Sequence, residues 1–478
     1  MNKFYITTPI FYLNGSPHIG HAYTTVAADV LARFQRQNKQ EVFFLTGTDE
    51  HGAKIAKSAQ KANMEVHKFC DKNAQAFLKL WEGLGISYDD FLRTSEPRHE
   101  EAVKEFLNQL KSAKTPKNRP ALYEDEYSGL YCEGCEAYKT ESDIENGLCP
   151  EHKIKPITLK ERNWFFRLLD FEESLKKQIG LKKMKIMPEG RQKEVAGFIK
   201  HGLTDIAISR ANVPWGIKVP FDESQTVYVW VDALINYLSA LGWPKSKKFE
   251  KFWPADLHLI GKDILKFHAV IWPALLMALK IELPKSIFAH GYFTVGDEKM
   301  SKSVGNVISP EHLIKQFGAD ATRYLLLSLY PFGQDGDITI EKINLKYKSA
   351  LANGLGNLVS RVLNLVETEF EGVIPVAVPS PRNLKNRNKL LENEEIYEAI
   401  GEIEDAVAFA NQYIEKNKLW QIVKTKKEEA GIILSGLCAL ICEIAKYIDP
   451  IMPNISKDIT DRLSAKKITK GEPLFPIV

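Results

Sequence analysis

The chain has 478 residues, of which 44% are hydrophobic and 26% charged, so it is globular and long enough for three or four compact units. Its formal net charge of +3 excludes a generally basic nucleic-acid coat and leaves only a local patch for RNA. Six cysteines in so long a chain do not form a disulfide framework, and neither residues 1–13 nor the apolar stretch 269–279 has the make-up of a signal peptide or membrane span, so we expect a cytoplasmic protein.

The first part of the chain alternates strand-like and helix-like segments. Residues 4–10 and 41–46 have the apolar pattern of strands, and residues 22–36 between them have that of a helix. This order indicates a parallel sheet that binds ligands at the carboxyl ends of its strands. Neither a G-x-G-x-x-G fingerprint nor a P-loop follows the first strand, so a nucleotide would be held in another way.

A His-x-x-His turn lies between the first strand and the first helix. Backbone amides at a helix N-terminus stabilise anions, and the imidazoles of His18 and His21 fall on one face of the first turn. Gly20 between them has no Cβ to keep a nucleotide at a distance. Such a turn is often only a capped helix start, but we interpret this one as half of an ATP site.

A cysteine cluster interrupts the alternation within residues 116–210, which we interpret as an insertion in the sheet domain. Cys132, Cys135, Cys149 and His152 form a C-x2-C…C-x2-H set whose spacing matches a tetrahedral zinc site. Protein side chains fill all four positions, which predicts a closed, structural zinc. The alternative is that these four are ordinary buried or surface groups.

Strand-like segments return after the insertion. Residues 226–231 and a strand-helix-strand pattern over 257–290 would complete the sheet. Residues 299–303 (KMSKS) follow, and their two lysines suit the pyrophosphate of ATP as mobile point charges, although a Lys-Ser run is usually a solvated loop. Beyond residue 310 helical periodicity dominates, which predicts a helical bundle.

Together, the His-Ile-Gly-His turn and the KMSKS pentapeptide resemble the two signatures of the class I aminoacyl-tRNA synthetases. Residues 228–233 (YVWVDA) and 261–268 (GKDILKFH) narrow the resemblance to the methionyl-tRNA synthetases, over essentially the whole chain. The resemblance implies an α/β fold in which a Rossmann-like parallel-sheet catalytic domain carries an inserted zinc-knuckle connective domain and is followed by an α-helical bundle. The implied boundaries are residues 1–117 and 226–290 for the two halves of the catalytic domain, 118–225 for the insertion, 291–350 for the KMSKS loop and stem-contact region, and 351–478 for the anticodon-binding helices.

The resemblance also implies the residues of the site. ATP would be bound by His18, Gly20, His21, Gly261, Asp263, Lys299, Met300, Ser301, Lys302 and Ser303, with His18, His21, Lys299 and Lys302 catalytic and Mg²⁺ bridging phosphate oxygens. Methionine would be bound by Ile10, Tyr12, Asp49, Trp230, Tyr237, Ile264, Phe267 and His268. A carboxylate suits the substrate ammonium, and aromatic edges suit a thioether. Arg210 is a further expected phosphate contact.

The RNA-binding residues are expected among the C-terminal helices. Asn357 and Arg361 stand four residues apart on one helix face, and Trp420 lies at the start of another helix. Spacing alone favours a core tryptophan and a solvated arginine. The resemblance reverses this, because it implies that the three residues bind the anticodon by base stacking and by hydrogen bonds to base edges. The expected partners are therefore ATP, methionine and tRNA, and without an appended C-terminal domain we expect a monomer.

Three alternatives stay open on the sequence: another class I synthetase, a nucleotidyltransferase acting on a small molecule, and a non-catalytic zinc-ribbon nucleic-acid binder. The zinc set occupies much of the insertion and leaves no room for the editing domain of leucyl, isoleucyl and valyl enzymes. A closed zinc set also disfavours a cysteinyl enzyme. The nucleotidyltransferase would not need the helical bundle, and the binder leaves the paired ATP motifs unexplained.

Overall fold

A computed structural model describes residues 3–134, 137–139, 141–150, 153–181, 183–295, 298–299, 308–374, 376–384 and 386–476. The chain divides into two compact units, each described below by itself. The first, here called the sheet unit, comprises Met1–Ser16, Lys39–Lys79 and Ser87–His290. The second, here called the helical unit, comprises Pro17–Asn38, Leu80–Ile86 and Gly291–Val478.

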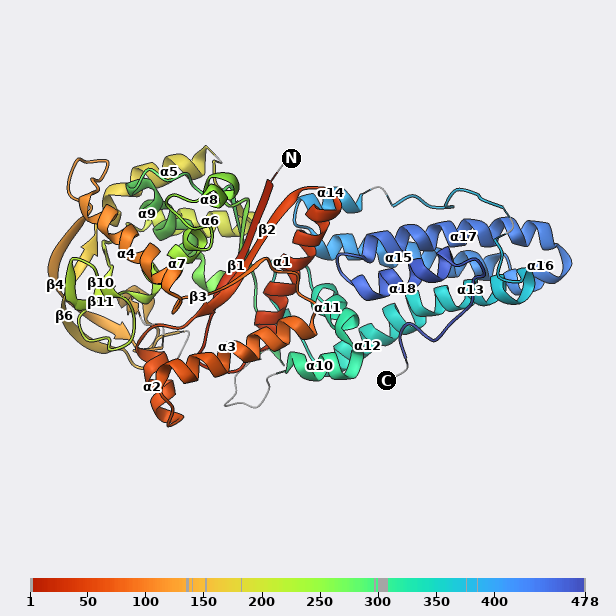
Figure 1. Cartoon of the computed structure of the whole chain (residues 1–478), viewed down its shortest axis with the longest axis horizontal. Coiled ribbons are helices and arrows are strands. Elements are labelled where there is room, and N and C mark those ends of the chain that lie inside the picture. The colour runs from red at the N-terminus through yellow and green to blue at the C-terminus, as the bar shows by residue number, and fades with distance from the viewer. Residues whose placement is uncertain are drawn as a thin grey trace. The chain divides into compact units, whose positions relative to one another are not determined.

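Six strands of the sheet unit form a parallel sheet in the order β3-β2-β1-β12-β13-β7. Their bounds are β1 (Lys3–Tyr12), β2 (Glu41–Asp49), β3 (Asp90–Arg93), β7 (Lys185–Met187), β12 (Leu257–Gly261) and β13 (Ser286–His290). Strands β1 and β2 lie side by side and end in register, with Tyr12 opposite Asp49 (Figure 1). The predicted parallel α/β fold is confirmed, and the last residues of β1 and β2 meet at one end of the sheet.

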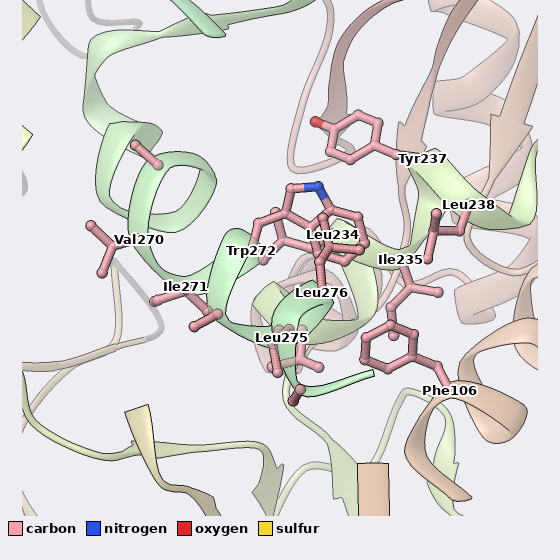
Figure 2. Packing of buried hydrophobic residues seen from close by; sticks show 14 of the residues in the cluster. Phe106, Leu234, Ile235, Tyr237, Leu238, Val270, Ile271, Trp272, Leu275 and Leu276 are labelled. Carbon is pink, nitrogen blue, oxygen red and sulfur yellow. The ribbon is translucent and has the colours of Figure 1, made fainter. Parts of the chain in front are cut away.

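Helices cover the sheet and bury a large apolar cluster. The helices of this region are α2 (Ala53–Lys61), α3 (Val66–Gly83), α4 (Pro97–Ser112), α7 (Val229–Ser239), α8 (Lys247–Phe252) and α9 (Trp272–Ala278), with the short turns η3 (Lys262–Ile264) and η4 (Phe267–Ile271) before α9. Trp272 is fully buried, and its ring lies 6.2 Å from that of Phe106 on α4. Figure 2 shows Trp272 beside Leu234 and Leu276, so that α4, α7 and α9 pack together. This packing fixes α7 and η4.

The insertion builds two small antiparallel sheets and also contributes to the parallel sheet. Its elements are β4 (Leu122–Cys132), β5 (Ala137–Lys139), η1 (Glu141–Asp143), β6 (Ile157–Phe166), η2 (Leu168–Phe171), α5 (Glu172–Gly180), α6 (Glu189–Lys200), β8 (Ile206–Ala207), β9 (Ser209–Arg210), β10 (Lys218–Val219) and β11 (Asp222–Val227). The sheets run β5-β4-β6-β8 and β10-β11-β9. Strand β7 also comes from this part of the chain and pairs with β13.

The strand predicted over residues 226–231 is wrong in position and in pairing. Strand β11 ends at Val227 and belongs to the antiparallel sheet, and α7 begins at Val229. The run V-Y-V-W-V is rich in β-branched and aromatic residues, which favours a strand locally. Val231, Leu234, Ile235 and Leu238 are buried at helical spacing, however, and this tertiary burial overrides the local preference.

The helical unit contains most of the helices of the C-terminal half and the first helix of the chain. Its elements are α1 (Ile19–Gln37), β14 (Phe293–Val295), β15 (Glu298–Lys299), α10 (Pro310–Phe317), α11 (Ala319–Ser328), β16 (Gly336–Asp337), α12 (Ile340–Lys346), η5 (Tyr347–Gly356), α13 (Asn357–Phe370), α14 (Arg387–Glu392), α15 (Ile396–Lys416), α16 (Leu419–Thr425), α17 (Lys427–Ile448) and α18 (Pro453–Ser464). Helices α13, α15 and α17 run side by side (Figure 1), which confirms the predicted bundle.

Helix α17 forms the core of this bundle. In the described part of the chain, it is the helix whose length and apolar composition would suffice to cross a membrane. Leu434, Leu437, Ile441 and Ile444 are all fully buried in the bundle. A central bundle helix is apolar for that reason, so the composition of α17 follows from its packing.

Candidate functional site

A buried hydrogen-bond chain links α7 to the turns after β12. The Tyr237 hydroxyl lies 2.7 Å from Nε2 of His268, whose Nδ1 lies 3.0 Å from the carbonyl oxygen of Ile264. A carbonyl only accepts, so Nδ1 carries the proton and Nε2 accepts from the tyrosine. Burial lowers the pKa of His268 to about 4, against the opposing effect of the Ile264 hydrogen bond. At neutral pH His268 is therefore an uncharged imidazole of fixed tautomer.

Two aromatic rings form a wall next to this chain of hydrogen bonds. Trp230 and Phe267 stack with ring centroids 4.1 Å apart and planes inclined by 13°. Trp230 falls within the strand predicted over residues 226–231, whereas Trp230 and Tyr237 both lie on α7. Phe267 and His268 likewise lie in the helical turn η4 and Ile264 in η3, a few residues after β12 ends. The predicted residues are thus brought together, but by helical turns and not by strand ends.

The ends of β1 and β2 supply the other predicted methionine residues. Ile10 pairs with Gly47 and Tyr12 with Asp49, the last residue of β2. Asp49 is buried at 7% exposure, and its carbonyl accepts a hydrogen bond from the Leu13 amide. A carboxylate at the carboxyl end of a parallel strand lies where such sheets bind ligands, as the sequence predicted.

Asp232 of α7 joins two histidines in a network that the sequence analysis missed. Its Oδ2 lies 2.7 Å from Nδ1 of His51, and its Oδ1 lies 2.8 Å from Nε2 of His99. Nδ1 of His99 lies 2.8 Å from the Ser239 hydroxyl. Burial alone would raise the pKa of Asp232, but the charge and hydrogen bonds of the histidines lower it to about 2. Burial opposes a charge on His51, yet Asp232, with help from Glu100 and Glu50, raises the pKa of His51.

The residue before His51 is held on the opposite side of the same turn. Both carboxylate oxygens of Glu50 accept hydrogen bonds from Arg93, at 2.7 and 3.0 Å, and the buried carboxylate also accepts from Thr48 and Ser95. Trp215 donates its indole N–H to the Glu50 carbonyl, and its own carbonyl accepts from the Gly52 amide. Gly52 has φ of 107°, which favours glycine. The turn after Asp49 is therefore fixed from several directions.

Gly261 and Asp263 follow the end of β12. A Cβ added at Gly261 would lie 2.6 Å from Oδ1 of Asp263, so any side chain there would displace the carboxylate. Asp263 is exposed. An exposed carboxylate beside bare backbone at a strand end is suited to accept hydrogen bonds from a ribose hydroxyl.

The His-x-x-His turn lies in the helical unit and forms the N-terminus of α1. Nδ1 of His18 accepts from the Gly20 amide at 3.1 Å, and Nδ1 of His21 accepts from the His18 amide at 3.2 Å. The two rings stack with centroids 3.7 Å apart. Because each Nδ1 accepts, a neutral ring carries its proton on Nε2. The histidines therefore cap the helix through Nδ1 and, as neutral rings, keep a donor at Nε2, so the two interpretations of this turn are compatible.

The strand that leads to the KMSKS segment is anchored on the same helix. Thr294 of β14 pairs with Lys299 of β15, and the Phe293 ring lies 4.6 Å from Tyr23 on α1. Only the backbone of Lys299 is described, and Met300, Ser301, Lys302 and Ser303 lie outside the described residues. The lysine motif thus leaves β15 from a strand pair that packs against the first turns of the histidine-motif helix.

Two of the four predicted zinc ligands are described. Cys132 ends β4 and Cys149 lies in the following loop, where the Lys153 amide donates to its carbonyl. Both thiols are fully buried. Cys135 and His152 lie outside the described residues. Buried thiols without a disulfide are the donors that Zn²⁺ prefers, so these residues fit a zinc site.

The three predicted RNA residues gather on one surface of the helical unit. The Arg361 guanidinium lies 2.8 Å from Glu415 of α15 and 5.8 Å from the centre of the Trp420 ring. Asn357 lies one turn before Arg361, and Nδ2 of Asn357 lies 3.5 Å from the Asn411 side-chain oxygen. Asn357, Arg361, Asn411 and Glu415 line a cavity of about 730 Å³. Trp420 is 40% exposed, so one large aromatic face is open to solvent beside an arginine.

Arg210 has a different environment from the one expected. Its Nε lies 2.8 Å from Glu161 in a buried ion pair, and its guanidinium lies over the Tyr131 ring at 4.3 Å. The pKa of Glu161 is lowered by this arginine despite burial. Arg210 therefore joins β9 to β6 and β4 within the insertion, and this ion pair gives it a structural role in place of the expected phosphate contact.

Comparisons with known proteins identify the family of the chain. The sequence model of the tRNA synthetases class I (M) family matches residues 4–155 and 152–363. The chain is 40% identical to the methionine–tRNA ligase of Caldanaerobacter subterraneus subsp. tengcongensis, over 99% of this chain and 78% of that protein, and 41% identical to that of Rickettsia felis, over 99% and 94%.

A solved structure of Mycobacterium tuberculosis methionyl-tRNA synthetase bound by methionyl-adenylate aligns with a TM-score of 0.93 at 36% identity, covering 99% of this chain and 100% of that one. A second structure of that protein, also in complex with methionyl-adenylate, has a TM-score of 0.91 at 38% identity, covering 97% and 94%. With a family model that spans most of its length and relatives of this similarity, the chain belongs to the methionyl-tRNA synthetase family of class I aminoacyl-tRNA synthetases.

Proposed function

We propose that this chain is a methionine–tRNA ligase, which activates methionine with ATP to methionyl-adenylate and transfers the methionyl group to the 3′-terminal adenosine of tRNA(Met). The observation that carries the proposal is the full-length match to a structure bound by methionyl-adenylate. In the first step a methionine carboxylate oxygen attacks the α-phosphorus of ATP, and the bond to pyrophosphate breaks. No enzyme nucleophile takes part, so catalysis rests on positioning and on stabilisation of charge.

The methionine pocket lies in the sheet unit. Asp49 accepts hydrogen bonds from the substrate ammonium, and Tyr12 and His268 lie near the sulfur. The walls of the methionine pocket are formed by Ile10, Trp230, Tyr237, Ile264 and Phe267. The stacked pair of Trp230 and Phe267 supports this assignment, because a polarisable thioether is favoured beside aromatic rings.

ATP is bound by groups from both motifs. His18, Gly20 and His21 contact the phosphates, and Gly261 and Asp263 contact the ribose. Lys299 and Lys302 stabilise the leaving pyrophosphate, and Met300, Ser301 and Ser303 of the same motif also bind ATP. Mg²⁺ supplies charge neutralisation to the phosphate oxygens when bound with ATP. The capping of α1 through Nδ1 supports the role of the histidines, because it leaves the donor of each neutral ring on Nε2.

Four further features belong to the same proposal. The insertion consists of residues 118–225 and holds a structural zinc, bound by Cys132, Cys135, Cys149 and His152. Residues 1–117 and 226–290 form the catalytic domain, 291–350 the KMSKS and stem-contact region, and 351–478 the anticodon-binding domain. The enzyme acts in the cytoplasm. Asn357, Arg361 and Trp420 bind the anticodon, supported by the exposed ring, the arginine and the cavity that lie together there.

An ATP–pyrophosphate exchange assay with each amino acid in turn tests the function. Exchange should depend on methionine alone, and the product should charge tRNA(Met). Selective exchange with another amino acid would assign a different synthetase, and exchange without charging would favour a small-molecule nucleotidyltransferase. Lys302→Ala should abolish most adenylate formation and leave methionine binding intact, because the lysine acts mainly on the transition state. Equal loss of both would contradict its role.

A further inference from the structure

The buried carboxylate of Asp232 lies between two parts of the methionine pocket. It is 1% exposed, and its two histidine partners His51 and His99 are 3% and 0% exposed. Asp232 is two residues after Trp230 on α7, and His51 is two residues after Asp49 at the end of β2. The ion pair of Asp232 with His51 therefore connects the helix that carries the aromatic wall to the turn that carries the ammonium-binding carboxylate.

Among the contacts that hold the turn after Asp49, this one ties it to α7. Glu50 and His51 point to opposite sides, with Glu50 bound to Arg93 near β3 and His51 bound to Asp232 on α7. The His51 ring also packs edge-on against Trp215 at 5.3 Å. Removing the Asp232 bond would leave the turn held by Trp215 and by the contacts of Glu50, without the one side-chain bond that ties it to α7. The Asp49 carboxylate would then be less closely fixed relative to that helix.

We propose that Asp232, through His51, is a positioning residue that sets the distance between Asp49 and the aromatic wall, and that His99 fixes the orientation of Asp232. Asp232 touches no substrate in this proposal and acts through the two pocket elements that it joins. The inference rests on the proposed methionine-binding role of Asp49. It assigns a role to three residues for which packing alone would be the simpler account.

The nitrogen atoms that the two histidines use differ, and this difference gives a sharp test. His51 binds Asp232 through Nδ1, whereas His99 binds it through Nε2. The side-chain amide of asparagine places its donor near the Nδ1 position, and that of glutamine reaches the Nε2 position. A positioning hydrogen bond therefore predicts that asparagine replaces His51 better than glutamine does, and that the order is reversed at His99. A space-filling role predicts glutamine as the better replacement at both positions, because its volume is closer to that of histidine.

Methionine-dependent pyrophosphate exchange supplies the measurement. Asp232→Asn, His51→Gln and His99→Asn should each raise the methionine KM roughly 10-fold or more, the effect expected on losing a charged hydrogen bond. The KM for ATP should change less than about twofold. His51→Asn and His99→Gln should recover most of the lost affinity. Equal KM values for asparagine and glutamine at each position, or a parallel rise in the KM for both substrates, would overturn the proposal.

Two controls separate this inference from simpler explanations. Asp170 is another buried carboxylate in an ion pair, with Arg119 in the insertion, so Asp170→Asn measures the effect of lost stability alone and should leave the methionine KM unchanged. Asp49→Asn tests the proposed function. If Asp49→Asn leaves the methionine KM unchanged, the pocket assignment fails. If Asp49→Asn raises it and Asp232→Asn does not, only the positioning role fails. Circular dichroism of each variant identifies any that do not fold, and the rescue pair at His99 then carries the test.

Discussion

The proposed methionine pocket and the proposed RNA surface differ in how their side chains are held. In the pocket Tyr237, His268 and Asp232 are almost fully buried, and each is hydrogen-bonded to protein. At the RNA surface Arg361 and Trp420 remain partly exposed, and the ion pair of Arg361 is with the 58%-exposed Glu415. The proposed methionine pocket is therefore preorganised, whereas the side chains of the proposed RNA surface can exchange solvent or protein partners for bases.

This difference has an energetic consequence. A buried polar group that loses its partner keeps its full desolvation cost, so changes in the pocket should affect stability and substrate binding together. An exposed ion pair contributes little to folding, so changes at the RNA surface should affect binding alone. The following experiments, ordered from the largest expected effect to the smallest, test that separation.

The first experiment tests whether the stability lost on breaking an ion pair depends on the burial of that pair and not on its proximity to the methionine pocket. Arg323 of α11 and Asp29 of α1 form an ion pair of 2.7 Å in the helical unit with no exposed side-chain surface. Arg323 also donates to the carbonyls of Leu84, Pro450 and Ile451. Arg323→Met should lower the free energy of unfolding by about 3–5 kcal/mol, because it leaves Asp29 buried with one partner fewer. Urea denaturation measures this.

The control for that experiment is an exposed pair in the same unit. Lys457 and Asp461 lie 2.8 Å apart on α18 with most of both side chains in solvent. Lys457→Met should cost less than about 1 kcal/mol. Similar losses in the two variants would remove the distinction between buried and exposed charge on which the comparison depends.

The second experiment uses acid to remove the charge of Asp232. A pKa lowered from 3.8 to about 2 stabilises the folded state by roughly 2 kcal/mol above pH 3.8. Because the folded value is the lower one, this contribution is lost as the pH falls from 3.8 through about 2. Between pH 5 and pH 2 the free energy of unfolding should fall by more in the wild type than in Asp232→Asn. Parallel curves would mean that the network does not hold the carboxylate ionised.

The third experiment changes the exposed ring of the RNA surface. Trp420→Ala should lower kcat/KM for tRNA charging roughly 10-fold, through the loss of base stacking. Pyrophosphate exchange should be unaffected. Ile432→Ala removes another exposed apolar side chain, on α17, and should change neither reaction. A loss of exchange in Trp420→Ala would indicate that the tryptophan supports the fold.

The smallest effect is expected from one hydroxyl in the pocket. Tyr237→Phe removes the donor to Nε2 of His268 and leaves that nitrogen buried without it. We expect about 1 kcal/mol lower stability and roughly a fivefold higher methionine KM. Thermal unfolding and exchange kinetics measured on the same samples test whether the two effects occur together. A change in only one would argue against a pocket in which stability and binding are coupled.

Sequence patterns predicted the parts of the fold that depend on local order. The alternation around residues 4–46 gave β1, α1 and β2 within a few residues, and helical periodicity gave the bundle. The strand over 226–231 was wrong because the burial that makes α7 a helix comes from distant elements. Of the predicted residues, Trp230 stacks on Phe267 and Tyr237 is hydrogen-bonded to His268, while Arg210 binds Glu161.

The missed residues show why the rest could not be predicted. His51 stands in the same segment, residues 48–52 (TDEHG), from which Asp49 was chosen, and Asp232 stands in YVWVDA. Their partnership spans 181 residues, and that of Asp232 with His99 spans 133. No local pattern reports a contact over such a separation. The direct signal would have been that these three polar side chains are buried, and a sequence does not reveal burial.

Strand β7 places a short segment of the insertion along the outer side of β13, whose five residues are all buried. A long unpaired strand at the edge of a sheet is a template for pairing with other molecules. An edge strand of three residues, such as β7, exposes few backbone groups for such pairing. Excising the insertion to obtain a smaller catalytic fragment would uncover β13, and such a fragment would be prone to self-association.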